Sequence, residues 1–181
     1  MGYLTLIVGC MFAQKTTELL RRIRRYQSIG YKVLVVNYAH DIRYGENCIA
    51  SHDIDKVPAL AVERLSEVPE EALGNHKVLV IDEGQFYPDL LDRVAAWADK
   101  YDDLHIVVSG LDGDAERRPF GQMLQLVPHA EEVMRLSAYC SRCADGTLAH
   151  FSKKIAGGGQ QVEIGAADKY IPVCRRHFLS T

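Results

Sequence analysis

Two adjacent carboxylates after a short apolar run form the most informative local pattern in the chain. Val78–Ile81 contains four apolar residues, which predicts a short buried strand, and Asp82 and Glu83 follow it directly. In an open α/β sheet, ligands bind at the carboxyl ends of the strands, so both carboxylates would face a ligand there. One of them can hold Mg²⁺ while the other accepts a proton.

A second pattern with chemical potential lies upstream. Leu4–Val8 is an apolar, β-prone run that opens into a segment resembling the phosphate-loop pattern G-x-x-x-x-G-K-[ST]. Gly9, Lys15 and Thr16 fit this pattern, whereas Gln14 stands where the pattern has glycine. In such a loop, backbone N–H groups surround a phosphate, the lysine reaches the β/γ-phosphates and the hydroxyl ligates Mg²⁺. Gln14 costs energy if its position needs a positive φ.

Taken alone, the upstream pattern also fits an ordinary strand-to-helix turn with an exposed lysine. The carboxylate pair favours the phosphate loop, because a strand, loop and helix followed by a strand that ends in aspartate is the paired arrangement of P-loop NTPases. The sequence therefore predicts an α/β fold with a P-loop NTPase-like parallel sheet.

The remaining patterns supply the elements that must position these residues. Helical spacing is found over 16–29 and 88–101, with shorter helical patterns over 58–73 and 121–127, and apolar strands are predicted over 32–37, 104–109 and 133–136. The polar stretch 38–56 and the charged stretch 110–120 are expected to be loops, the former a functional one. After residue 137 the chain has more Gly and Cys and no long periodic segment. We therefore expect a nucleotide-binding domain over 1–137 and a small lobe over 138–181.

Four residues of this small lobe have the spacing of metal ligands. Cys140-x-x-Cys143 and Cys174-x-x-His177 are two pairs, each suited to one tight turn. Together they complete a tetrahedral Cys₃His site for Zn²⁺ that leaves no position for substrate, which indicates a structural role. The alternative is a set of unrelated cysteines and a surface histidine.

Composition narrows the class of protein. The chain has 181 residues, of which 48% are hydrophobic, and its formal net charge is −3. This charge argues against a general nucleic-acid binder, and the basic run Arg21–Arg25 lies on a predicted helix, where a solvated face or a subunit contact is expected. We see neither a signal peptide nor an apolar run of about 20 residues that could span a membrane, so a cytoplasmic protein with no membrane partner is expected.

The ordered motifs resemble those of the cytosolic-type (type II) thymidine kinase family over nearly the whole chain. The resemblance rests on Met11-Phe12 inside the loop, TELLRRIRR at 17–25, DIRY at 41–44, DEGQF at 82–86, LDG at 111–113, RxPF at 117–120, ADKY at 167–170 and the two metal-ligand pairs. It implies a P-loop domain and a zinc-bearing lobe whose lasso, roughly 156–169, covers the nucleoside. It also implies transfer of the ATP γ-phosphate to the 5′-hydroxyl of thymidine, and of deoxyuridine.

The resemblance also assigns roles to residues. Glu83 matches the general base, Asp82 and Thr16 match the Mg²⁺ side, and Lys15 matches the phosphate lysine. Residues expected to bind ATP with Mg²⁺ are Gly9, Met11, Phe12, Ala13, Gln14, Lys15, Thr16, Thr17, Asp41, Arg43, Asp82 and Gln85. Residues expected around the nucleoside are Met11, Phe86, Phe120, Ile164, Gly165 and Tyr170. The alternatives are core packing for Met11, Phe86 and Phe120, a surface strand position for Tyr170 and a solvated loop position for Arg43.

The resemblance further implies feedback inhibition by dTTP and a homotetramer, with a dimer as the alternative. The family carries Gly and Pro where this chain has Gln14 and Cys10. Gln14 leaves three explanations open: an engineered substitution, a working natural variant, or a degenerate copy. It motivates a rival function, that of a catalytically impaired nucleotide-binding relative. A zinc-ribbon nucleic-acid module is a third possibility, and the acidic charge argues against it.

Overall fold

A six-stranded parallel sheet forms the centre of the molecule in a computed structural model that describes residues 2–41, 48–50, 56–156 and 169–180. The strand order is β5-β2-β6-β7-β1-β8, and every neighbouring pair is parallel. The strands are β1 (Tyr3–Gly9), β2 (Val33–Tyr38), β5 (Leu60–Val62), β6 (Val78–Ile81), β7 (His105–Gly110) and β8 (Glu132–Leu136). The predicted α/β class is confirmed.

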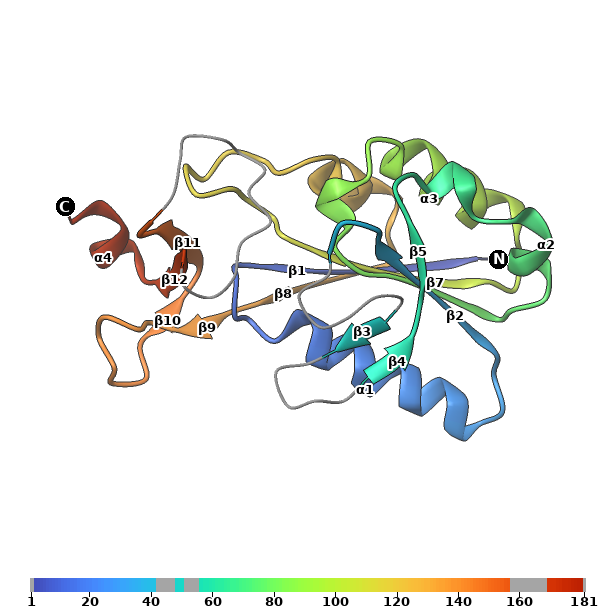
Figure 1. The fold of residues 1–181 in the computed structure, drawn as a ribbon, viewed down its shortest axis with the longest axis horizontal. Helices are drawn as coiled ribbons and strands as arrows, with labels where there is room; N and C mark the ends of the chain where they lie inside the picture. Colours follow the sequence, from blue (N-terminus) through green and yellow to red (C-terminus); the bar gives the residue numbers. More distant parts are fainter. Residues whose placement is uncertain (1, 42–47, 51–55, 157–168, 181) are drawn as a thin grey trace.

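Helices cover both faces of this sheet (Figure 1). On one face, α1 (Lys15–Ser28) buries Leu19, Leu20 and Ile23 against side chains of β1, β2, β6 and β7. The other face packs against α2 (Glu70–Gly74), α3 (Leu90–Lys100) and the 3₁₀ helices η1 (Leu65–Glu67) and η3 (Met123–His129). The apolar stripe at helical spacing along α1 explains this placement, because it can be buried only against a sheet face. Both helices predicted with long periodicity are thus present.

A small lobe continues from β8 at the carboxyl end of the sheet, at the left of Figure 1. It consists of two antiparallel strand pairs and a terminal helix. These are β9 (Ala138–Tyr139) with β10 (Leu148–Ala149), β11 (Phe151–Lys154) with β12 (Tyr170–Val173), and α4 (Arg175–Leu179). We call these elements the C-terminal lobe. Such short elements bury few side chains of their own, which makes a metal crosslink valuable there.

Three sequence predictions need correction. The helical pattern at AVERL (61–65) is wrong over its first half, since β5 pairs there with β2. So short a helical pattern does not specify a helix by itself, and at this position pairing with β2 at the sheet edge prevails. The stretch 38–56 contains β3 (Cys48–Ala50), which pairs with β4 (Lys56–Pro58), so it is not wholly irregular. Finally, β8 is an edge strand whose Val133 is 45% exposed, whereas a core strand was expected.

Among the described residues, no helix is both long and apolar enough to cross a membrane. The two core clusters lie on opposite faces of the sheet, each between the strands and the helices that cover that face.

Candidate active site

The turn between β1 and α1 has the backbone of an anion-binding loop. Gly9 ends β1 with φ 151°, and a Cβ atom at this position would clash with the carbonyl oxygen of Leu136. Two other loop residues, Phe12 and Gln14, have φ values of 64° and 60°. Helix α1 then starts at Lys15, so its free N–H groups face the loop.

Gln14 occupies the left-handed region that glycine adopts at low cost. Its φ and ψ are 60° and 31°, and its side chain is exposed and makes no capping hydrogen bond to α1. A residue with a Cβ atom pays about 1–2 kcal/mol in this conformation. The missing glycine therefore has a measurable physical consequence, as the sequence pattern predicted.

The loop and the carboxylate strand meet across β7, which lies between β1 and β6. The hydroxyl of Thr16 donates a hydrogen bond to Oδ2 of Asp82 over 3.1 Å. Asp82 is 5% exposed, and its other oxygen, Oδ1, accepts the backbone N–H of Glu83 over 3.0 Å. A hydroxyl and a carboxylate at this distance can share one Mg²⁺ shell, so the residues present fit a magnesium–nucleotide site.

Lys15 lies within the same group of charges. Its Nζ donates to the carbonyl oxygen of Cys10 over 2.9 Å, which folds the side chain over its own loop. Burial lowers the pKa of Lys15, while the negative charges of Glu83, Cys10 and Asp82 act in the opposite direction. The Glu83 carboxylate is therefore close enough to Lys15 for its charge to act on the ammonium group.

Glu83 has a strained backbone and a supported side chain. Its φ of 54° is left-handed, and the next residue, Gly84, has no room for a Cβ atom, which would lie 2.6 Å from Sδ of Met123. The amide of Gln85 donates to Oε2 of Glu83 over 2.5 Å, and its Oε1 accepts the N–H of Leu111 over 2.9 Å. Gln85 is 4% exposed. It thus links the carboxylate to the loop that follows β7, and the ATP contact that the resemblance implied for Gln85 stays a prediction.

A third carboxylate is found at the end of a neighbouring strand, since β2 pairs with β6. Asp41 follows β2, where its N–H donates to the carbonyl oxygen of Tyr38. Burial raises the pKa of Tyr87, and the charges of Asp82, Glu83, Tyr38 and Asp41 raise it further. The carboxylates of Asp41, Asp82 and Glu83 therefore follow the carboxyl ends of two adjacent strands, β2 and β6.

Aromatic rings gather beside the carboxylates. Phe86 lies 5.1 Å from Tyr38 and 5.7 Å from Phe120 between ring centroids. Phe120 is 7% exposed and Phe86 is partly exposed, so the two rings contact each other at the boundary of the core. Tyr170, on β12, is 8% exposed with Nζ of Lys154 lying 5.9 Å from its ring centroid, so the alternative of a surface position is wrong.

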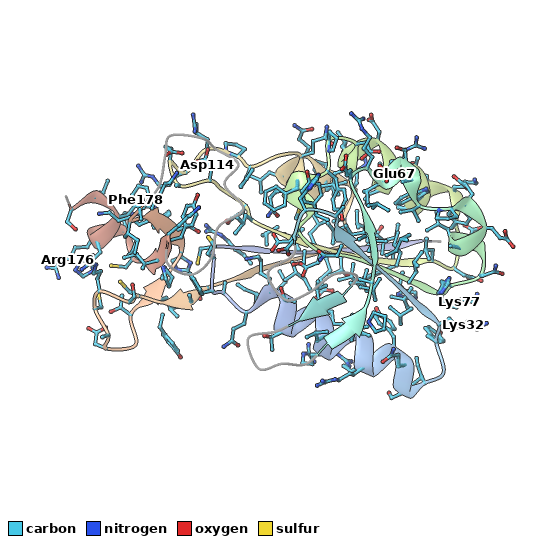
Figure 2. All side chains as sticks on the ribbon, in the orientation of Figure 1. Lys32, Glu67, Lys77, Asp114, Arg176 and Phe178 are labelled. Atoms are coloured by element: carbon cyan, nitrogen blue, oxygen red, sulfur yellow. The ribbon has the colours of Figure 1, made fainter. Side chains whose placement is uncertain are left out.

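The loop after β7 carries Phe120 and contacts the C-terminal lobe through a side chain. Asp114 is 5% exposed and accepts hydrogen bonds from the backbone N–H groups of Glu116 and Arg118. The guanidinium of Arg117 lies 4.6 Å from the ring of Phe178 on α4. Figure 2 labels Asp114 and Phe178 at the same end of the molecule, opposite Lys32 and Lys77, which precede β2 and β6. The loop is therefore supported from the lobe side.

The four metal-ligand candidates converge in the C-terminal lobe. Sγ of Cys143 lies 3.8 Å from Sγ of Cys174, and Nδ1 of His177 lies 3.4–3.6 Å from the three sulfur atoms. Tetrahedral Zn²⁺ with standard bond lengths requires separations of about 3.8 Å between sulfurs and about 3.6 Å between sulfur and nitrogen. The cluster therefore fits a structural zinc site, with all four coordination positions filled by protein.

Cys140 is the thiol of this cluster that ionises most readily. Desolvation opposes ionisation of Cys140, but backbone hydrogen bonds at Cys174, Cys143 and Arg142 lower its pKa to about 6. The thiolate is the form that binds metal, so Cys140 is prepared for coordination at neutral pH.

For four other predicted site residues, the structure shows how exposed each side chain is. Ala13 is buried against the C-terminal lobe, Met11 and Phe12 are partly exposed, and Thr17 is exposed on α1. Arg43, Ile164 and Gly165 lie outside the described residues, as does most of the expected lasso.

Sequence patterns did not identify two contacts of the site. Tyr38 packs against Phe86, and Ser152 of β11 accepts the N–H of Met11 over 2.9 Å. Tyr38 could have been found from its place at the end of a predicted strand, beside the functional loop. Ser152 had no signal, because it is separated from Met11 by 141 positions and belongs to no motif.

Comparison with known proteins shows which family this chain is similar to. The thymidine kinase family model matches residues 2–178. The chain is 44% identical to cytosolic thymidine kinase of Homo sapiens over 175 residues, which cover 96% of this chain and 72% of the human protein. It is 39% identical to the thymidine kinase of Monkeypox virus over 180 residues, covering 99% and 98% of the two chains, and 42% identical to the cytosolic enzyme of Gallus gallus over 175 residues, covering 96% and 75%. Because both the family model and these relatives align along almost its full length, the chain belongs to the thymidine kinase family.

Proposed function

We propose that this protein transfers the γ-phosphoryl group of ATP to the 5′-hydroxyl of thymidine, and also of deoxyuridine, giving the nucleoside monophosphate and ADP. The observation that carries the proposal is the hydrogen bond between Thr16 and Asp82, with Lys15 and Glu83 beside it. The names and the high identity of the relatives support the same reaction.

Each charged residue has a role in this reaction. The loop from Gly9 to Thr16 and the start of α1 bind the triphosphate, and Lys15 neutralises charge on the β- and γ-phosphates. Mg²⁺, when bound, supplies further charge neutralisation and orients the phosphates, and Thr16 and Asp82 would hold it. Asp41 and Arg43 assist phosphate and metal positioning.

Glu83 is the catalytic base. The 5′-oxygen forms a bond to the γ-phosphorus as the bond to the β,γ-bridging oxygen breaks, and the hydroxyl proton passes to the Glu83 carboxylate. The hydrogen bond from Gln85 holds this carboxylate in place, so Gln85 acts as a positioning residue. A buried hydrogen-bond donor of this kind fixes the orientation of the carboxylate, which must accept a proton from one hydroxyl in one geometry.

The nucleoside would lie against the aromatic cluster. Phe86, Phe120, Tyr170 and Met11 form its walls, and the lasso with Ile164 and Gly165 closes over the base. A pocket around the 5-methyl group discriminates by only about 1–3 kcal/mol, which is why deoxyuridine is included as a substrate. We assign nucleotide chemistry to 1–137 and nucleoside cover to 138–181, and we propose a cytoplasmic homotetramer, or dimer, that dTTP inhibits.

One assay tests the proposal. Purified protein is supplied with ATP, Mg²⁺ and thymidine, and dTMP is measured, with Glu83→Gln as the control variant. We expect dTMP from the parent protein and a loss of at least about 100-fold in the variant. Absence of dTMP at saturating ATP would contradict the proposal.

The left-handed Gln14 favours one second candidate function, a catalytically impaired relative that only binds nucleotide or nucleoside. Calorimetry with ATP, thymidine and dTTP separates the two. Binding of any of these without dTMP formation would support the impaired relative.

A further inference from the structure

The phosphate loop packs directly on the C-terminal lobe. Cys10 and Ala13 of the loop are buried in one cluster with the lobe residues Cys140, Ala149 and Cys174. The thiol of Cys10 also donates to the carbonyl oxygen of Ala149 over 3.4 Å. Two zinc ligands and the nucleotide loop therefore belong to the same small core.

One polar contact joins the two parts at the loop backbone. The Ser152 hydroxyl oxygen accepts the Met11 N–H over 2.9 Å. Ser152 is 5% exposed and lies on β11, opposite Pro172 of β12, so its position is set by the strand pair. A buried hydroxyl on a paired strand is a fixed acceptor, and a flexible surface serine would not be.

The loop needs such support because its backbone is strained. Phe12, next to Met11, and Gln14 both have left-handed conformations that side chains with a Cβ atom disfavour. Strained residues persist only where the surrounding structure holds them in place. The contacts at Met11 and Cys10 immediately precede the first strained residue, so they are placed to supply this restraint.

We propose that Ser152 is a positioning residue of the phosphate loop: by accepting the Met11 N–H, it holds the loop in its phosphate-binding conformation. The C-terminal lobe thereby supports ATP binding through β11. This inference rests on the proposed function, in which the loop binds ATP.

The test compares Ser152→Ala with a matched control, Ser141→Ala. Ser141 is a serine of the same lobe whose hydroxyl donates to the carbonyl oxygen of Pro172 and not to the loop. Calorimetry with Mg²⁺ and a non-hydrolysable ATP analogue measures nucleotide affinity, and thymidine affinity and zinc content are measured on the same samples. We expect Ser152→Ala to lower the affinity for the analogue about three- to tenfold, with zinc content unchanged. Thymidine affinity should fall less than analogue affinity, because Met11 borders both substrates. Ser141→Ala should match the parent protein, and Ser152→Thr should recover most of the affinity.

A second measurement does not depend on nucleotide. Hydrogen exchange of the loop amides in nucleotide-free protein should be at least about threefold faster in Ser152→Ala than in the parent or in Ser141→Ala. Unchanged exchange and unchanged analogue affinity would overturn the inference. Equal losses of analogue affinity, thymidine affinity and zinc content would also overturn it, because they indicate that the whole lobe is destabilised. If the parent protein binds no analogue, the proposed function fails, and the exchange comparison still decides the role of Ser152.

Discussion

The hydroxyl of Thr16 donates to the carboxylate of Asp82 over 3.1 Å, although 66 positions separate the two residues. Thr16 is in the first turn of α1, which follows β1, and Asp82 directly follows β6. In the sheet, β7 separates β1 from β6. This contact joins the loop between β1 and α1 to the carboxylate pair that follows β6.

Replacement of Asp82 by Asn should impair magnesium use more than folding. The variant keeps the size of the side chain but removes the negative charge that favours Mg²⁺. We expect kcat/KM to fall about 10- to 100-fold and the Mg²⁺ concentration for half-maximal rate to rise. Thr16→Ser, which keeps the hydroxyl, is the control and should remain near parental activity. An unchanged Mg²⁺ dependence in Asp82→Asn would contradict the assignment.

Replacement of Gln14 by Gly should relieve strain in the loop. Glycine adopts φ 60° at low cost, so the free energy of unfolding should rise by about 1 kcal/mol, and kcat/KM for ATP should increase. Urea unfolding and steady-state kinetics measure the two effects.

Gln14→Ala separates the two ways in which Gln14 could be a handicap. Alanine removes the long side chain but keeps the Cβ atom, so it leaves the backbone strain in place. If strain is the handicap, the alanine variant should resemble the parent. If it gains as much as the glycine variant, crowding by the side chain is the cause instead.

The ion pair between Arg22 and Glu132 should contribute pH-dependent stability. Nη1 and Nη2 of Arg22 each donate to a Glu132 oxygen over 3.0 Å, which ties α1 to β8. The hydrogen bond from Arg22 lowers the pKa of Glu132, against a smaller effect of burial. A lowered carboxyl pKa stabilises the fold above the ordinary carboxyl pKa, and this stabilisation is lost as the pH falls through the lowered value.

Glu132→Gln tests this pair. Because the glutamate is partly exposed, we expect a loss of only about 1 kcal/mol at pH 7 in urea unfolding. The difference from the parent should hold between about pH 6 and 8 and shrink below about pH 4. Asp103→Asn, which breaks the exposed pair with Lys77, is the control and should change stability little. A Glu132→Gln deficit that is constant down to pH 3 would argue against the ion pair as its source.

Removal of one metal ligand should destabilise the C-terminal lobe. Cys143→Ser is expected to lose one bound zinc per chain and to lower the melting temperature by about 5 °C or more, because the lobe buries little apolar surface of its own. Metal analysis and thermal unfolding measure these effects. A chelator should reproduce them in the parent and add nothing in the variant. Full zinc content in Cys143→Ser would contradict the ligand set.

Much of this architecture was readable from local patterns. Apolar runs and helical spacing identified β1, α1, β2, β6, α3 and β7, and the paired spacing of three cysteines and a histidine identified the metal cluster. These signals involve residues that are close in sequence, where side-chain periodicity reports directly on the backbone. The short β5 was missed because its three residues form a strand only by pairing with β2.

The sequence by itself determined which residues could carry chemistry: a lysine and a threonine at a helix start, two carboxylates at a strand end and four metal ligands. Only the tertiary structure decided that β7 lies between β1 and β6, that Gln85 donates a hydrogen bond to Glu83, and that Ser152 accepts the Met11 N–H. Chain order does not state which strands become neighbours, and hydrogen bonds between distant segments follow from packing of the whole chain. For this reason the sequence identified the chemical groups, but not the hydrogen bonds that hold them in position.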